Sequence, residues 1–573
     1  MLTKKSAQLD LALKRARGVS GRGLCAALCA LASGVVTRHG MSAETQPVNK
    51  QTPANETTAS EQSPRVIYIR EYRVRGAHQL TSAEIGDIVY PFLGPGRTEA
   101  DVEQARAALE KAYQDKGFQT VSVEVPAQSA RGGVVFLQVN ENKVGRLRVK
   151  GSRFFLPSQI KAEAASLAEG TVPNFNDVTR DIVALNQLPD RRVTPELRAG
   201  AEPGTVDIDL NVKDTFPLHG DIELNNRYSA NTTPLRLNAS LSYNNLWQLG
   251  HSIGASFQTS PEDFSDVKVF SGFYIARFPA WGNFSLLAQA TKQESNVSTL
   301  GSVAVAGRGE SAGLRGIWTL PGGKDFYQTL SAGFDYKHYT QRVALGTIDP
   351  NATTNDNSAA VIETPLTYFP LSAVYTATWA PKGAVTELNA GLTAGLRGLG
   401  SGAVEFENNR YHAGGNFIAL RGDLSHTHDL PLGFQAFGKM QGQLSDQALV
   451  SSEQFGGGGL GTARGYLEAE ALGDNAVFGT LEFRSPSLLA WLPEKWKGNE
   501  WRVYAFTDAG RLTLHSPLPE QEDTFTLASY GFGSRIRLLD HLNGSLDAGI
   551  PLIGLTETQA HDLRLTFRVW GDF

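Results

Sequence analysis

Hydrophobic and polar residues follow two different periods along this chain of 573 residues, and the change falls near residue 214. Before that point, apolar residues at helical spacing lie between short strand-like runs. After it, apolar and polar residues alternate with period two, as in the run 235–243 with the sequence LRLNASLSY. Alternation of this kind places all apolar side chains on one face of a strand. The pattern predicts an α/β region followed by a large antiparallel sheet.

The α/β region contains an internal repeat with a period near 75 residues, because Arg73-Val74-Arg75-Gly76 recurs as Arg148-Val149-Lys150-Gly151. Each copy continues with two helix patterns, which start near Thr81 and Asp101 in the first copy and near Pro157 and Asp177 in the second. Strand-like runs close each copy, at 121–125 and 134–139 in the first and at 206–212 in the second. We expect two β-α-α-β-β modules, over residues 64–142 and 143–214.

The alternating region, residues 215–573, contains about sixteen strand-like runs. We place them at 218–229, 235–247, 251–260, 266–278, 282–295, 307–319, 326–342, 362–379, 384–396, 409–428, 433–446, 476–488, 501–513, 525–538, 542–553 and 562–573. An even number of strands with one polar face is typical of a closed barrel that crosses a membrane. A soluble β-sandwich alternates in the same way and is the alternative.

The N-terminal segment 1–43 is typical of a secretory signal, since basic residues precede an apolar run at 24–36 and small residues follow it. The apolar run is too short to cross a bilayer as a helix. Cleavage after Ala32 and cleavage after Ala43 both fit. Residues 44–63 are polar and predict a flexible linker. Cys25 and Cys29 are the only cysteines, so the exported chain is expected to contain none.

The composition and the local motifs argue against catalysis and against the binding of nucleic acid, nucleotide or metal. The net charge of −5 comes without a basic block, which disfavours nucleic acid. Gly456, Gly458 and Gly461 match a dinucleotide fingerprint, but no βαβ pattern surrounds them. The sequence His-Thr-His-Asp at 426–429 falls at the end of an expected strand, where a turn is the simpler interpretation. We therefore expect no catalytic residues, no metal and no cofactor.

One pair of motifs carries more information than the rest of the chain. Ala463-Arg464-Gly465-Tyr466 lies in a glycine-rich loop, and Phe506-Thr507-Asp508-Ala509-Gly510 lies on an expected strand. An arginine on a loop inside a barrel requires an inward carboxylate, and Asp508 has the polar parity. Glu482 and Arg484 have the polar parity on the neighbouring strand. In a hydrated lumen such a pair would be screened and contribute about 1 kcal/mol.

These features resemble a known family. The repeated module resembles the POTRA domain, and the whole chain is similar to outer-membrane transporters of two-partner secretion, such as the secretion partners of haemolysins and filamentous haemagglutinin. The resemblance implies that the loop 447–475 folds into the barrel, and that its tip pairs with the thirteenth strand. The implied pairing motif is Arg464, Gly465 and Tyr466 with Phe506, Asp508 and Gly510, and Ala463 replaces the family's usual valine. The last strand, with Phe567 and Phe573, resembles a membrane-targeting signal.

The resemblance also implies a function. It predicts a pore in the outer membrane of a Gram-negative bacterium, with POTRA domains in the periplasm that recognise the N-terminal secretion domain of an unfolded exoprotein. Transport without ATP, contact with outer-membrane lipid and insertion by the barrel-assembly machinery follow from the same resemblance. An assembly factor of the same superfamily is the alternative, and a diffusion porin is less favoured because it needs no POTRA repeat.

Overall fold

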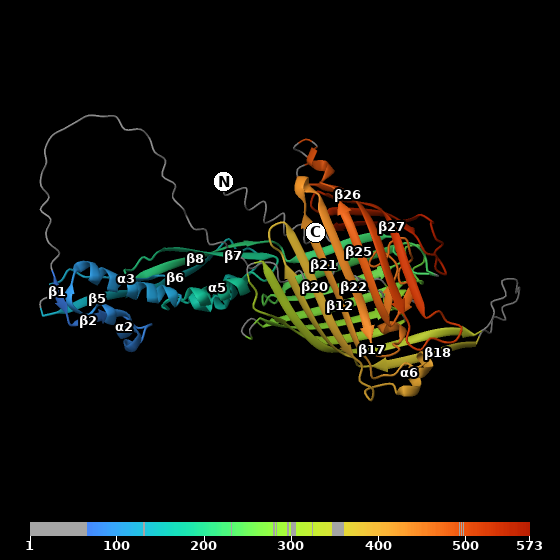
Figure 1. Ribbon diagram of the computed structural model, residues 1–573, viewed down its shortest axis with the longest axis horizontal. Coiled ribbons are helices and arrows are strands. Elements are labelled where there is room, and N and C mark those ends of the chain that lie inside the picture. Colours follow the sequence, from blue (N-terminus) through green and yellow to red (C-terminus); the bar gives the residue numbers. More distant parts are fainter. Residues whose placement is uncertain are drawn as a thin grey trace. The chain divides into compact units, whose positions relative to one another are not determined.

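The computed structural model describes residues 66–573 apart from 130–131, 231, 279–280, 282, 295–296, 299–304, 307, 324, 346–359, 492, 494–495 and 497. The expected signal segment 1–43 and linker 44–63 lie outside these residues. The described chain divides into two compact units, one that ends at Thr215 and one that runs from Phe216 to Phe573 (Figure 1). Among the described residues, no helix has the length and apolar character needed to cross a membrane.

The first module contains a three-stranded sheet of order β2-β5-β4 and two helices. Its elements are β1 (Ile67–Ile69), β2 (Glu71–Arg75), α2 (Ser82–Val89), η1 (Tyr90–Phe92), β3 (Gly94–Arg97), α3 (Glu99–Asp115), β4 (Val121–Glu124) and β5 (Val134–Glu141). Both helices start with a capping box, formed by Thr81 with Glu84 and by Thr98 with Asp101. The expected order of elements is confirmed, and the short β1–β3 pair is an addition to it.

The second module repeats this order with the sheet β6-β8-β7. Its elements are β6 (Lys143–Lys150), α4 (Pro157–Glu163), η2 (Ala165–Leu167), α5 (Phe175–Leu185), β7 (Arg191–Ala199) and β8 (Thr205–Asp214). The sequence pattern does not predict β7, which pairs with β8 at the edge of this sheet and carries Pro195. A strand at a sheet edge tolerates proline and polar residues, so its sequence lacks the apolar alternation of a central strand.

Each module has its own apolar core between its helices and its sheet. The core of the first module includes Leu109 and Leu137, and that of the second includes Ile160 and Leu210. The two modules meet where α3 ends and α5 begins. Asn174 Nδ2 donates to the carbonyl of Lys116 at 3.0 Å, and the Phe175 amide donates to the carbonyl of Gly117 at 2.8 Å. The start of one helix therefore caps the end of the other.

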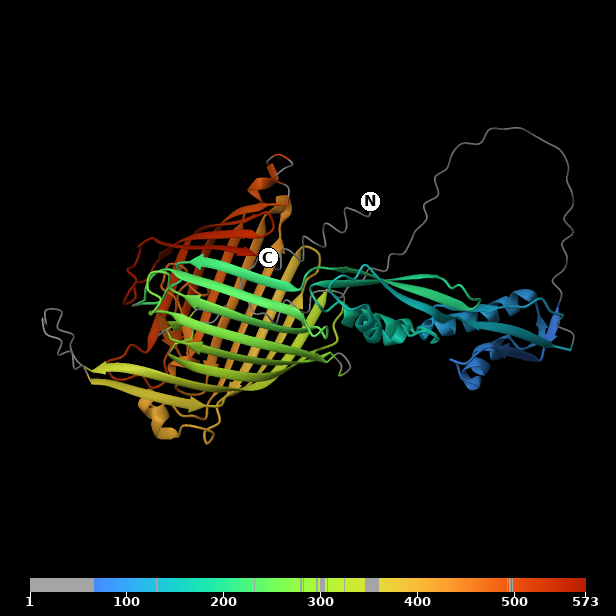
Figure 2. The same cartoon turned by 180° about the vertical axis from the view of Figure 1, so that it is seen from behind.

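The second unit is a closed antiparallel barrel of sixteen strands (Figure 2). Its strands are β9 (Leu218–Asn225), β10 (Arg236–Leu246), β11 (His251–Thr259), β12 (Lys268–Phe278), β13 (Phe284–Gln293), β16 (Arg308–Thr319), β17 (Phe326–Leu345), β18 (Ala360–Tyr368) with β19 (Leu371–Trp379), β20 (Ala384–Ala394), β21 (Ile418–Asp429), β22 (Gln435–Ser445), β25 (Asn475–Arg484), β26 (Glu500–Thr513), β27 (Thr524–Leu538), β28 (Leu542–Pro551) and β29 (Arg564–Asp572). The expected barrel is confirmed, and pairing of β29 with β9 closes it.

Two expected strands differ from the structure. The run 362–379 is divided at Phe369 and Pro370 into β18 and β19, which pair with successive parts of β17 and so form one barrel strand. Proline has no amide hydrogen to donate to the ladder, which explains the interruption. The run 409–428 begins as a strand only at Ile418, because α6 (Ala403–Asn409) occupies the preceding loop.

The barrel wall has an apolar outer face and a polar inner face. Along β25, Val477, Leu481 and Phe483 are exposed on the outside, whereas Glu482 and Arg484 are buried on the inside. Connections at the end where β9 begins are mostly short turns, and those at the other end are longer. Such asymmetry is typical of outer-membrane barrels, whose long loops face the cell exterior.

Candidate functional site

The loop between β22 and β25, the eleventh and twelfth barrel strands, has a paired stem and a tip that enters the barrel. It contains η5 (Ser451–Glu453), and β23 (Phe455–Gly457) pairs with β24 (Ala471–Gly473) to form the stem. The tip reaches Asp508 on β26, the thirteenth strand, five residues before that strand ends at Thr513. The structure therefore brings Arg464 and Asp508 together inside the barrel.

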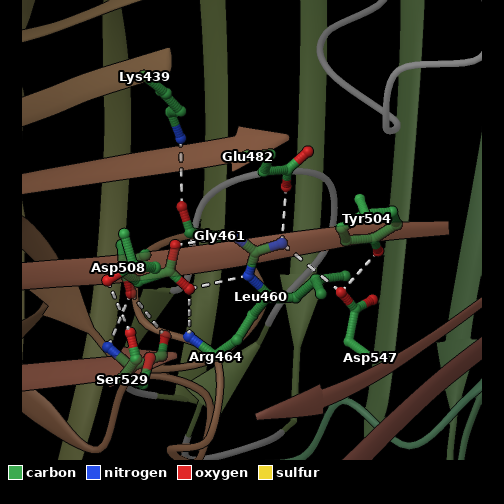
Figure 3. A network of polar contacts seen from close by, with 12 residues as sticks. Lys439, Leu460, Gly461, Arg464, Glu482, Tyr504, Asp508, Ser529 and Asp547 are labelled. Atoms are coloured by element: carbon green, nitrogen blue, oxygen red, sulfur yellow. Dashed lines mark hydrogen bonds and ion pairs between the residues drawn. The ribbon is translucent and has the colours of Figure 1, made fainter. Parts of the chain in front are cut away.

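Arg464 binds Asp508 through a two-pronged contact (Figure 3). Its Nε donates to Oδ2 at 2.8 Å, and its Nη2 donates to Oδ1 at 2.8 Å. The backbone amide of Arg464 donates to the same carboxylate at 3.0 Å. The guanidinium lies 3.6 Å from the ring centre of Phe506, so an aromatic face supports the cation. This fixed fork orients the loop tip as well as attaching it.

Further charges surround this contact. Arg464 Nη1 donates to Glu482 Oε1 at 2.6 Å and lies 3.6 Å from Asp547 Oδ1. Glu482 also accepts from Arg484 at 2.6 Å and from Arg535 at 3.3 Å. We call these six residues the lumen charge cluster: Arg464, Arg484, Arg535, Glu482, Asp508 and Asp547. It contains three charges of each sign, and each acid has a basic neighbour.

The lumen charge cluster is more buried than the sequence pattern predicts. The side chains of Arg464 and Asp508 are 5% and 1% exposed, so the expectation of a hydrated, screened pair is wrong. The loop itself excludes water, because Tyr466 and the stem pack against Phe478, Leu512 and Leu527 of the wall. Alternation along a strand identifies inward residues but gives no sign of how completely a loop covers them.

The other residues of the motif shape the surroundings. Tyr466 donates its hydroxyl to the carbonyls of Ala528 at 3.0 Å and Ile553 at 2.7 Å. The backbone of Gly465 has a φ of +100°, a conformation that residues with a side chain rarely adopt. A side chain on Gly510 would lie 2.1 Å from the ring of Phe478, so this glycine makes room for that ring.

The last strand places its two phenylalanines differently. Phe573 is exposed on the outer face, and its amide donates to the carbonyl of Gly220 on β9 at 3.0 Å. Phe567 is partly buried, and its amide donates to the side chain of Asn226 at 2.7 Å. The end of the chain thus joins the first barrel strand.

Three loop carboxylates that the sequence analysis did not single out also have basic partners. Glu453 pairs with Lys337 of β17, Glu468 with Arg227 at 2.7 Å, and Asp474 with the guanidinium of Arg410. The signal available in the sequence was the presence of several acidic residues in a loop that is expected inside the barrel. The basic partners of these acids are distant in sequence, so only the structure reveals the pairs.

The alternatives considered from the sequence fall on ordinary structure. Gly456 lies in β23 and pairs with β24, so it belongs to a strand ladder. His426 and His428 lie within β21 rather than in a turn. Across the part of the chain that the structure describes, no group of three or more His, Cys, Asp or Glu residues is arranged to hold a metal ion.

Comparison with known proteins identifies relatives of both units. Residues 204–536 match the family described as haemolysin secretion/activation protein ShlB/FhaC/HecB, and residues 67–142 match the ShlB-type POTRA domain. Outer membrane transporter CdiB of Escherichia coli O6:K15:H31 is 27% identical over 194 residues, which is 34% of this chain and 32% of that protein. This match therefore spans about a third of the relative's length.

Two further comparisons cover more of the chain. Outer membrane transporter CdiB of Dickeya dadantii is 20% identical over 424 residues, 72% of this chain and 71% of that protein. The structure of CdiB from Escherichia coli superposes with a TM-score of 0.62 at 20% identity and covers 91% of this chain and 93% of that one. The structural likeness shows the fold, and the family match covers more than half of the sequence. The chain belongs to the haemolysin secretion/activation protein family ShlB/FhaC/HecB.

Proposed function

We propose that this protein is an outer-membrane pore that translocates an unfolded partner exoprotein from the periplasm to the cell surface. The observation that carries the proposal is the loop seated inside the barrel by Arg464 and Asp508 in a chain of this family. A seated loop occupies the space that a polypeptide must cross, so transport requires it to move. The fixed, charge-balanced contact gives the loop a defined resting position from which to move.

The proposed organisation follows the sequence boundaries. Residues 1–43 direct export, 44–63 form a linker, 64–142 and 143–214 form two periplasmic POTRA domains, and 215–573 form the outer-membrane barrel with the loop 447–475. The match of residues 67–142 to a POTRA domain supports the first of these modules. The repeat of its element order supports the second.

We infer that the POTRA domains capture the N-terminal segment of the exoprotein as an added strand. The strand β2 pairs only with β5, and β6 pairs only with β8, among the residues described. Open strand edges bind extended chains through main-chain hydrogen bonds and tolerate varied side chains. Folding of the exoprotein outside the cell would then draw the chain through the pore, with no need of ATP, a cofactor or a catalytic group.

A secretion assay tests this function. The protein is expressed together with a candidate partner exoprotein, and the amount of exoprotein at the surface and in the periplasm is measured. We expect secretion by the full chain, periplasmic retention when residues 64–142 are deleted, and retention of an exoprotein mutated so that it cannot fold. Normal secretion by the deletion variant would contradict capture by the POTRA region. If the deletion instead impairs the assembly of other outer-membrane barrels while the exoprotein is still secreted, the assembly-factor alternative is favoured.

A further inference from the structure

A second buried carboxylate, Asp474, holds the base of the loop, ten residues after Arg464 of the tip. It lies directly before β25, and its side chain is completely buried. Its oxygens accept hydrogen bonds from three other segments, with partners Arg410 Nη1 at 2.5 Å, Arg410 Nη2 at 2.7 Å, the Leu449 amide at 2.9 Å, Gln454 Nε2 at 3.2 Å and the His515 amide at 2.7 Å. Donors occupy both carboxylate oxygens, which anchors a charge that water does not reach.

Arg410 supplies the side-chain donors to Asp474 from outside the loop, and His515 supplies a backbone amide. It caps the C-terminus of α6, where its amide donates to the carbonyl of Phe406 at 2.9 Å. Besides Asp474, its guanidinium contacts the carbonyl of Leu449 and donates to that of His515 at 3.2 Å. One planar fork thus ties together the α6 loop, the base of the in-folded loop and the loop between β26 and β27.

Apolar packing joins two of these segments, the α6 loop and the base of the in-folded loop. We call residues 403–417 the α6 segment. Phe406 and Ala413 of this segment are 1% and 3% exposed and pack in one cluster with Leu449 and Val450 of the loop base. Leu366 and Tyr368 of β18 belong to the same cluster. The α6 segment therefore lies on the loop base through both a charged and an apolar contact.

We propose that Arg410 and Asp474 are positioning residues that clamp the α6 segment onto the base of the in-folded loop. The closed clamp holds the α6 segment and the loop base together, and it is separate from the contact at the loop tip. A displaced loop base would leave the carboxylate without its fork, so release of the clamp accompanies any large movement there. The inference deepens the proposed function, but its principal test does not depend on secretion.

The chain offers a reporter and a matched control. Ala413 is buried in the shared cluster, and the sequence contains cysteine only at positions 25 and 29, within the expected export signal. An Ala413→Cys substitution therefore introduces one thiol that the clamp keeps covered. The control is Arg315, which donates to Asp335 at 2.5 Å in an ion pair between the neighbouring strands β16 and β17. The Arg315→Ala substitution removes an ion pair within the barrel wall and no part of the clamp.

The experiment uses the full-length, membrane-inserted Ala413→Cys protein as the parent and measures the rate at which a membrane-impermeant maleimide labels the introduced thiol. We expect Asp474→Asn and Arg410→Ala to raise this rate about tenfold or more, because each leaves a buried polar partner unsatisfied and favours local opening. Arg315→Ala and Arg464→Ala should leave it unchanged. The double variant Arg410→Ala with Asp474→Asn should label no faster than the faster single variant.

Labelling of the Asp474→Asn variant at the parental rate would overturn the proposal, as would equal acceleration by Arg315→Ala. If Asp474→Asn does not yield a heat-modifiable barrel, Arg410→Lys decides, since it keeps the charge and loses the fork. Accelerated labelling of Arg410→Lys supports the clamp, and parental protection overturns it. Absence of secretion by the parent protein would refute the proposed function and leave the labelling result standing.

Discussion

The POTRA domains are built around apolar cores, whereas the barrel encloses many buried charges beside smaller apolar clusters. In the domains the fully buried side chains include Leu109, Leu137 and Ile208, whereas inside the barrel they include Asp474 and Asp508. Many large apolar residues of the barrel, such as Leu481 and Phe532, are exposed on its outer face. The burial pattern of each unit follows from its surroundings, because water surrounds the domains and lipid surrounds the barrel wall.

This difference separates the residues that fold the protein from those that position the in-folded loop. The apolar cores of the POTRA domains supply their stability. In the barrel, strand pairing and the lipid-facing surface hold the wall, and the inner charges contribute little unless each is paired. The balance of three bases and three acids in the lumen charge cluster therefore fixes where the loop rests. We expect substitutions in the two units to fail in different assays.

The largest expected effect comes from breaking the contact at the loop tip. Arg464→Ala or Asp508→Ala leaves a buried charge without its partner, which costs about 3–5 kcal/mol of loop docking. Neither side chain belongs to the outer face, so both variants should reach the outer membrane as heat-modifiable barrels. Secretion should fall severely and channel conductance should change, as measured by exoprotein release and planar-bilayer recording.

A charge exchange sharpens this prediction. Arg464→Asp combined with Asp508→Arg keeps the balance of the lumen charge cluster and should recover part of the secretion if direct pairing is the main role. A role of Arg464 in contact with the exoprotein would leave the exchange as defective as either single variant. Normal secretion by both alanine variants would remove the functional assignment of the pair.

The next effect concerns the core of the first POTRA domain. Leu109 is fully buried between α3 and the sheet. Its replacement by alanine should lower the unfolding free energy of that domain by about 2–5 kcal/mol through lost burial and a cavity. Hydrogen exchange of β5 in the full-length protein measures the loss. Leu481→Ala, on the outer face of the barrel, is the control and should leave exchange of β5 unchanged.

Sequence patterns predicted the two units well where one physical constraint acts alone. Period-two alternation located the barrel strands because lipid and lumen impose opposite polarity on successive residues. It failed at β7, an edge strand with Pro195, and at residues 409–417, where α6 and its continuation replace a strand. There, contacts with other segments determine the structure.

The same limit applies to the candidate site. Parity and motif identified Arg464, Asp508, Glu482 and Arg484, and the structure brings all four together. The partners Arg535 and Asp547 come from strands whose register with the loop no local pattern reveals. The clamp between Arg410 and Asp474 joins two loops, and loops carry no periodicity from which pairing follows.

A smaller effect is expected at Gly465, beside the critical arginine. Its φ of +100° and the 3.2 Å distance from an added Cβ to Pro551 both oppose a side chain. Gly465→Ala should weaken loop seating by about 1–3 kcal/mol through backbone strain and reduce secretion partially. Gly461→Ala is the matched control, since no atom lies within 4 Å of its added Cβ. Equal secretion by the two variants would contradict the assigned role of the Gly465 backbone.

The smallest effect is expected at an exposed charge of the first POTRA domain, where solvent screens every contact. The hydrogen bond from Lys116, with those from Thr81, lowers the pKa of Glu84 from 4.5 to about 2. Because the pKa is lower in the folded state, the stabilisation is present above pH 4.5 and is lost as the pH falls toward 2.

The measurement compares thermal unfolding of the parent protein and of Glu84→Gln at pH 6 and at pH 2.5. The small difference at the higher pH should shrink at the lower pH, where the carboxylate is increasingly protonated. Lys116→Met should remove most of the same difference, because the lysine supplies the first contribution to the shift. A difference that persists at low pH would assign the effect to the shape of the Glu84 cap rather than to its charge. The comparison between the exposed Glu84 of the first POTRA domain and the buried Arg464 of the barrel would then have to be made on packing in both units.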